Sequence, residues 1–176
     1  MSRQPASTIA DTWFRRALAP WWVPGVGVFA LAFVVRLATL GVVARPEFVF
    51  QKYPTLALEM LHGRGQAVIA FTASPLYLYF WTVLHRLFPG GLAGPIVVQM
   101  ALGSLTCGLI ALAAAGWGGR RIGVAAGLAA AVYLPFVVND ASFVSEGLVL
   151  LCNALFLLAM GKVRLDPRAE IGRAHV

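Results

Sequence analysis

Two long apolar stretches constrain this chain more than any other feature. Val23–Val43 is apolar except for Arg36, and residues 95–117 carry no charge. Each stretch is long enough to cross a hydrocarbon core of roughly 30 Å as a helix. Shorter apolar runs follow Gly123 and Gly147, and the 176-residue chain is 60% hydrophobic and only 12% charged. We therefore predict an all-α protein, a polytopic integral membrane helical bundle of about four to five apolar helices.

The net charge and the cysteines narrow the possible functions. The formal charge is +7, but the basic residues lie at the ends of apolar segments and form no run that could follow a phosphate backbone. We therefore expect the lipid bilayer as a partner, and no nucleic acid. Cys107 and Cys152 lie within apolar runs, where a free thiol behaves as a small hydrophobic group. The sequence shows neither a disulfide framework nor the ligand spacing of a metal site.

The chain divides into a membrane module and two polar ends. Residues 1–20 contain three arginines and one acid, which indicates a cytoplasmic amino-terminal lead-in. Residues 21–160 form the membrane module, and residues 161–176 form a polar tail. The last six residues, Ile-Gly-Arg-Ala-His-Val, match the in-frame translation of a common sequencing adapter. We therefore expect residues 171–176 to be artefactual and the natural protein to continue beyond residue 170, so that the module is incomplete.

The basic loops predict how many times the chain crosses the membrane. Five crossings would place the Arg120–Arg121 loop and Lys162 outside, against the tendency of basic loops to stay in the cytoplasm. Residues 76–88 form the shortest apolar run, and we predict that this run enters the membrane without crossing it. Residues 44–74 and 139–146 then share the outer face.

Residues 44–74 contain a pattern that is typical of a short helix. Tyr53, Leu56, Ala57 and Met60 recur at helical spacing, and Gly63 is placed to end the helix. One face of this helix is apolar. We therefore predict an interfacial helix in the first outer loop.

Small residues mark one face of a later helix. Gly123, Gly127 and Ala131 are spaced by four, so that a neighbouring helix can approach closely. We expect their packing partners to lie beyond residue 170, in the missing part of the protein.

Four of the seven acids lie near apolar segments: Glu47, Glu59, Asp140 and Glu146. Glu47 is either a solvated loop acid or a general base, whereas Glu59 falls on the polar face of the interfacial helix. Asp140 either starts a helix or belongs to a site. Glu146, at the head of the last helix, either balances the helix dipole or belongs to a site. Arg36 is either an anchor that reaches the interface or a buried cation that faces a polar cavity.

Several short motifs follow one another in a recognisable order. A span ending in Arg36 precedes a loop with Tyr53, Ala57 and Gly63. After it come Ser74-Pro-Leu-Tyr77, Gln99-Met-Ala-Leu-Gly-Ser-Leu-Thr106, Gly119-Arg-Arg121, Ala130-Ala-Val-Tyr-Leu-Pro135 and Ser145-Glu146. In this order and spacing, most of residues 23–160 resembles polytopic glycosyltransferases of the GT-C class. The most similar branch is family 39, the dolichyl-phosphate-mannose-protein mannosyltransferase-like proteins.

The resemblance implies an activity and a location. Members of the class take a sugar from a polyprenyl-phosphate carrier and pass it to an acceptor on the non-cytoplasmic face. The implied partners are this donor and an acceptor lipid, glycan or protein, and the implied location is a bacterial inner (plasma) membrane, with several passes. The alternative is a non-enzymatic polytopic membrane protein, such as a transporter fragment or an assembly subunit.

The resemblance also suggests site residues. The usual base is an Asp shortly before the position of Tyr53, where this chain reads Glu47-Phe-Val-Phe-Gln-Lys-Tyr53. A carboxylate must take the proton of the acceptor hydroxyl, and cations or a possible divalent metal must stabilise the departing phosphate. No cofactor is assigned. The catalytic candidates are Glu47, Asp140 and Glu146, and the substrate-binding candidates are Arg36, Lys52, Tyr53, His62 and Arg64.

Overall fold

The structure is a computed structural model, and it describes residues 22–43, 52–63 and 74–165. This part of the chain is helical throughout, with loops and turns between the helices and no strand, so the expected all-α class is confirmed. The helices are α2 (Val23–Val43), α3 (Lys52–Leu61), α5 (Pro75–Leu87), α6 (Ala93–Gly118), α7 (Arg120–Val132), α8 (Leu134–Ala141) and α9 (Glu146–Leu165). Residues 1–20 and 171–176, for which a lead-in and an artefactual end are predicted, lie outside the described residues.

Fewer helices can cross a membrane by themselves than the sequence suggested. Val23–Gly41 and α6 are long and apolar enough, and α7 with α8 passes the same test as a pair bent by 53°. The described part thus has two candidate spans, or three with the bent pair, instead of about four to five apolar helices. The apolar part of α9, Glu146–Gly161, is one of the shorter apolar helices and does not reach the length of a full span.

The bend between α7 and α8 divides an apolar run that reads as continuous. Tyr133 has an extended conformation, with φ −68° and ψ 106°, and Pro135 lies in the first turn of α8. Pro135 has no amide hydrogen for the bond that a continuous helix would make to the preceding turn. The chain therefore turns here, and α8 packs against α6 and α2.

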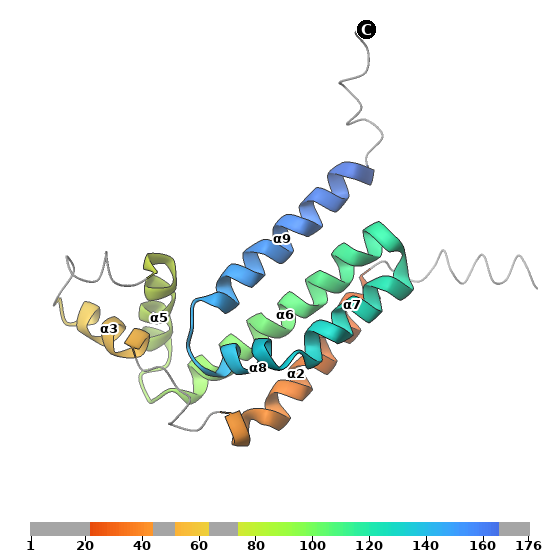
Figure 1. Ribbon diagram of the computed structural model, residues 1–176. Coiled ribbons are helices and arrows are strands. Elements are labelled where there is room, and N and C mark those ends of the chain that lie inside the picture. Colours follow the sequence, from red (N-terminus) through yellow and green to blue (C-terminus); the bar gives the residue numbers. More distant parts are fainter. Residues whose placement is uncertain (1–21, 44–51, 64–73, 166–176) are drawn as a thin grey trace, which may run out of the picture.

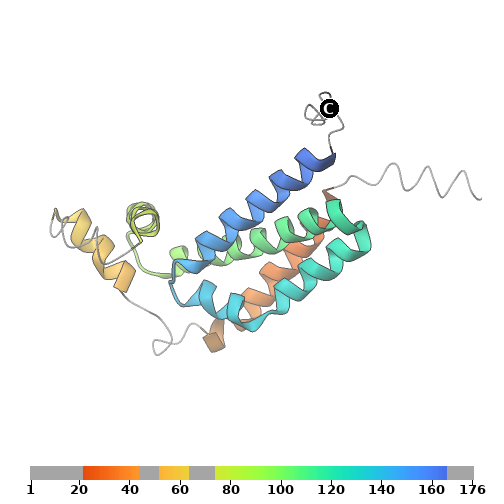
Figure 2. The same cartoon turned by 45° about the horizontal axis from the view of Figure 1, so that its top comes forward.

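Helix α6 lies at the centre of the bundle (Figures 1 and 2). It contacts α2 and α7, which also contact each other, and it contacts α9. The buried side chains between α2, α6 and α7 are those of Val28, Ala32, Cys107, Ala111 and Ala131. Most of them are small, so the helix axes can approach closely.

The small residues of α7 find their partners inside this chain. Gly123, Gly127 and Ala131 are all buried. A Cβ atom on Gly127 would lie 2.6 Å from the Cβ atom of Ala111 in α6 and 2.9 Å from a methyl group of Val28 in α2. The expectation that these residues await helices beyond residue 170 is therefore wrong. The sequence shows the small face of α7 but not which helix covers it.

Helices α3 and α5 form a separate pair at one end of the bundle (Figure 1). The predicted short helix is confirmed as α3, and Gly63 follows it with φ 71°, a conformation that favours glycine. The rings of Tyr53 in α3 and Tyr77 in α5 pack edge to face with 4.6 Å between their centroids. Helix α5 has 13 residues and is therefore about 20 Å long at 1.5 Å per residue, too short to cross a membrane core.

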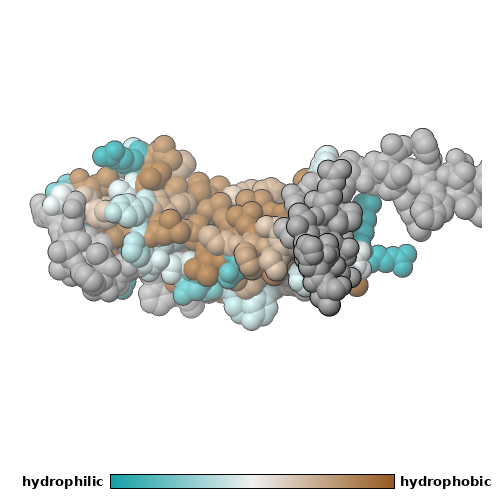
Figure 3. Space-filling view, turned by 90° about the horizontal axis from the view of Figure 1, so that it is seen from above, coloured by the Kyte–Doolittle hydropathy of each residue, from teal (hydrophilic) through white to brown (hydrophobic). Residues whose placement is uncertain are grey.

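The turn between α8 and α9 packs against the pair of helices α3 and α5. Phe143, in that turn, is fully buried together with Ala57 of α3 and with Tyr77, Leu78 and Trp81 of α5. The rings of Phe143 and Trp81 meet edge to face at 4.6 Å. Thus α3 and residues 139–146 lie at the same end of the bundle, whereas the loop between α6 and α7 lies at the other end. Figure 3 shows hydrophobic side chains over most of the middle of the molecule and hydrophilic ones mainly towards its two ends.

Candidate functional site

A buried ion pair links α2 to α8. The Nε atom of Arg36 donates a hydrogen bond of 2.7 Å to Oδ2 of Asp140, and the two side chains are only 0% and 4% exposed. Arg36 also donates through Nη1 to the carbonyl oxygen of Ala32, at 3.3 Å, and through Nη2 to the sulfur of Cys107, at 3.6 Å. Of the two interpretations of Arg36, the buried cation is therefore correct. A charge in this environment needs such partners because desolvation is costly.

Asp140 does not start a helix. It lies in the last turn of α8, and the next helix begins six residues later at Glu146. The helix-cap interpretation of Asp140 is therefore wrong, and its carboxylate instead neutralises Arg36.

Two glycines make room for the Asp140 carboxylate. A Cβ atom on Gly103 of α6 would overlap the carboxylate, and one on Gly147 of α9 would lie 3.3 Å from Oδ1. The ion pair thus requires a missing side chain on α6 where α8 crosses it. The roles of Gly103 and Gly147 were not predicted from the sequence. The available signals were Gly103 within the uncharged run of residues 95–117 and Gly147 directly after Glu146.

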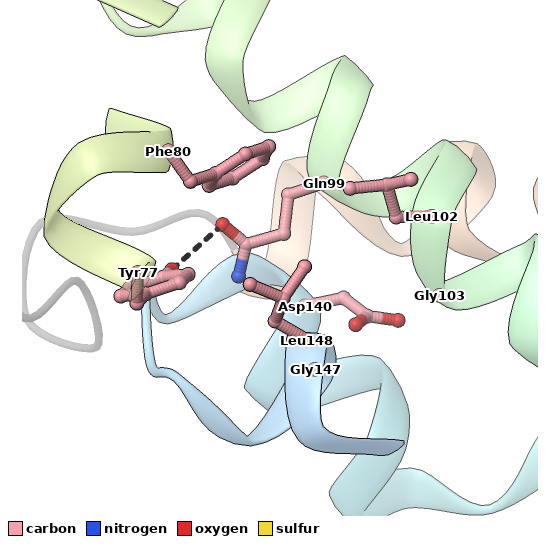
Figure 4. A pocket seen from close by; sticks show the side chains of 8 residues that line it. All are labelled: Tyr77, Phe80, Gln99, Leu102, Gly103, Asp140, Gly147 and Leu148. Carbon is pink, nitrogen blue, oxygen red and sulfur yellow. Dashed lines mark hydrogen bonds between the residues drawn. The ribbon is translucent and has the colours of Figure 1, made fainter. Parts of the chain in front are cut away.

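A small hollow separates Asp140 from the aromatic side chains of α5 (Figure 4). Its lining includes Tyr77, Gln99 and Asp140, and its volume is about 10 Å³, room for about one water molecule. The hydroxyl of Tyr77 donates a hydrogen bond of 3.0 Å to Oε1 of Gln99, and Nε2 of Gln99 donates to the carbonyl oxygen of Asn139 at 3.3 Å. Residue Gln99 therefore ties α5 and α8 to α6.

A second hollow of the same size lies on the side of Arg36. It is lined by Arg36, Thr106, Phe136 and Asp140, among others, and its volume is also about 10 Å³. The carboxylate of Asp140 therefore lies between two spaces that each fit about one water molecule. Neither space is large enough for a sugar or a phosphate group.

Tyr77 belongs to the buried cluster against which the starts of α3 and α9 pack. Burial raises the pKa of Tyr77 above its ordinary value, and the nearby Tyr53 and Glu146 raise it further. The hydroxyl thus remains protonated and able to donate to Gln99. Tyr53 at the start of α3 and Leu148 near the start of α9 both pack against the buried cluster that contains Tyr77, so the fold brings these two helix starts together.

The exposed candidates are at this same end of the bundle. Glu146 is the first residue of α9, as expected, and its exposed carboxylate lies at the positive end of the helix dipole. Lys52, the first residue of α3, is also exposed. His62 is exposed just after α3, with Nδ1 2.7 Å from the carbonyl oxygen of Leu58. Glu59 is exposed on α3, as its polar-face interpretation predicts.

Two of the candidate residues lie outside the described part of the chain. The described residues form no metal site. Glu47 and Arg64 lie outside the described residues. Within the residues that are described, no three His, Cys, Asp or Glu side chains are close enough to hold a metal ion.

The fold and the buried ion pair define a class of protein. The described helices make this an all-helical protein with two or three helices able to span a membrane, joined by charges inside the bundle. Comparison of the chain with models of protein families, with curated proteins and with solved structures finds no match.

Proposed function

We propose that this protein is a membrane glycosyltransferase that moves a sugar from a polyprenyl-phosphate carrier to an acceptor on the non-cytoplasmic face. The ordered motifs that resemble the GT-C class support this proposal. The observation that carries it is a shared buried cluster: Tyr53 of α3 packs against Tyr77, and Leu148, two residues after the exposed Glu146, packs against the same cluster. The acceptor is a lipid, a glycan or a protein, and the membrane is a bacterial inner membrane.

In this proposal Glu146 is the general base. Its exposed position allows an acceptor hydroxyl to approach, which the buried Asp140 does not. The departing phosphate carries negative charge, and Lys52 and His62 on the same end supply positive charge or hydrogen bonds to it. These contacts need a positioned charge more than a rigid geometry, so side chains at the ends of a short helix suffice.

The pair of Arg36 and Asp140 acts here as a positioning device. It fixes the end of α8, and the turn after α8 leads within a few residues to Glu146. Asp140 is therefore a positioning residue in this proposal and not the base. Glu47 remains a second candidate base from the first outer loop.

The test measures sugar transfer from a radiolabelled polyprenyl-phosphate sugar in membranes that contain the protein. Glu146→Gln should lower the rate by about 100-fold or more, because a general base contributes about that much. Glu59 is an exposed acid on α3, so Glu59→Gln is the matched control and should transfer sugar at the rate of the unchanged protein. Full activity of Glu146→Gln at equal expression would overturn the assignment of the base.

A second function is favoured by one observation. The charges of Arg36 and Asp140 neutralise each other, and the spaces beside them hold about one water molecule each. Such a pair links two helices without leaving room for a substrate, which fits a non-enzymatic membrane protein, such as a transporter part or an assembly subunit. Absence of transfer with every polyprenyl-phosphate sugar tested, from a protein shown to be folded, would favour this function.

A further inference from the structure

An apolar groove lies at the opposite end of the bundle from α3 and Glu146. It runs between α6, α7 and α9, has a volume of about 410 Å³, and is lined by Ile110, Ala113, Ala114, Trp117, Ile122 and Leu157. Gly118 completes the lining. Trp117 and Ile122 are more than half exposed, at 58% and 57%. The groove is thus much larger than the hollows beside Asp140, and it is open and apolar.

Gly161 of α9 leaves room for the indole of Trp117, one of the residues that line the groove. A Cβ atom on Gly161 would lie 3.0 Å from Nε1 of Trp117. The indole of Trp117 therefore lies against α9 near the end of the groove. Tryptophan is enriched at the level of lipid headgroups, because its ring is apolar and its N–H group is polar.

Two arginines lie in the chain between residues that line the groove. Arg120 and Arg121 begin α7 directly between Gly118 and Ile122, which both line the groove, and both arginines are exposed. Residues 93–132, which form α6, the connecting loop and α7, contain no Asp or Glu. The start of α7 adds the positive end of a helix dipole, with no side-chain cap on its free N–H groups. This combination favours an anion next to an apolar channel.

We propose that the groove binds an anionic phospholipid, with one acyl chain between α6, α7 and α9 and the phosphate against Arg120 and Arg121. Basic clusters between or beside membrane helices are a common form of anionic-lipid recognition. A second copy of the chain fits less well, because a symmetric contact would bring the two pairs of arginines together, and α6 and α7 supply no acid to balance them. The proposal does not depend on sugar transfer, since the groove and Glu146 lie at opposite ends of the bundle.

Quenching of tryptophan fluorescence by brominated lipids tests this proposal. The whole chain is placed in phosphatidylcholine vesicles that contain equal mole fractions of either brominated phosphatidylglycerol or brominated phosphatidylcholine. The signal of Trp117 is the difference between the unchanged protein and Trp117→Phe. We expect the phosphatidylglycerol to occupy the groove with about a 10- to 30-fold preference, because each arginine near the surface contributes to binding of an anionic headgroup.

Variants separate the headgroup from the chain. Arg120→Gln with Arg121→Gln should abolish the preference, whereas Arg86→Gln, an exposed arginine at the end of α5, should retain it. Ala114→Phe should fill the groove and reduce quenching by both lipids, whereas Ala129→Phe, at an exposed position of α7, should not. Equal quenching by the two lipids, or a preference that survives in the double variant, would overturn the proposal. A stable dimer that excludes both lipids from Trp117 would overturn it as well.

Discussion

The side chains of Arg36 and Asp140 are separated by 104 residues in the sequence and by 2.7 Å between Nε and Oδ2. The free energy that the pair adds to the fold is smaller than the free energy lost when one partner alone is removed. Removing water from both charges costs about as much as their attraction returns, so the pair as a whole adds little free energy. Removing one partner leaves a buried charge without compensation. The pair therefore specifies how α2 and α8 meet more than it stabilises the bundle.

This asymmetry leads to a prediction for single and double variants. Arg36→Met and Asp140→Leu should each lower the free energy of unfolding by about 3 to 5 kcal/mol, because each leaves one buried charge. The double variant should lie close to the unchanged protein. Unfolding in mixed detergent micelles measures these differences. Arg86→Met is the control, because Arg86 is exposed, and it should change the value by no more than about 0.5 kcal/mol. A double variant as unstable as the sum of the two single ones would contradict this account.

At the residue scale the sequence identified the charges but not their pairing. Composition made Arg36 and Asp140 conspicuous, since charged residues in apolar segments are rare. Their contact depends on the bend at Tyr133 and on the space left by Gly103, and both are properties of the packed bundle. Glu146 was placed correctly because the start of a helix is a local feature.

Helices were predictable where local signals mark their ends. The short helix α3 was expected from the spacing of its apolar residues and from Gly63. The division between α7 and α8 was not, because both sides of Tyr133 are apolar and only Pro135 marks the break. The partners of α7 also depend on tertiary packing, since a small face fits any helix that approaches it.

Helix α3 is held to the molecule mainly through α5, which leads to a prediction at the scale of this element. Trp81 is fully buried between Tyr77 and Phe143, and the ring of His85 reaches the carbonyl oxygen of Pro54 at 3.2 Å. Trp81→Ala should loosen α3 and raise its hydrogen exchange by 10-fold or more, because loss of a buried tryptophan typically costs about 3 to 5 kcal/mol.

Exchange in α6 is the internal reference for this variant. Helix α6 packs mainly on α2, α7 and α9, so its protection should remain unchanged. If α3 and α6 lost protection equally, the separate pairing of α3 with α5 would be wrong. Trp22→Ala, at an exposed position before α2, should leave both helices as they are.

The molecule as a whole has two chemically different ends. One end joins α3, α5 and the turn between α8 and α9, and it carries Lys52, His62 and Glu146. The other carries Arg120 and Arg121 beside the apolar groove. Basic loops favour the cytoplasmic side, so we expect the end with Glu146 on the opposite side. Both proposals depend on this orientation, the first through the donor and the second through the lipid headgroup.

Labelling of single cysteines in intact cells tests the orientation most directly. Cys107→Ala and Cys152→Ser provide the background, and His62→Cys, Ser145→Cys and Gly119→Cys are introduced one at a time. An impermeant maleimide should react with positions 62 and 145 from outside, and with position 119 only after the membrane is permeabilised. Reaction of positions 145 and 119 from the same side, or of 62 and 145 from opposite sides, would contradict the arrangement of this molecule in the membrane.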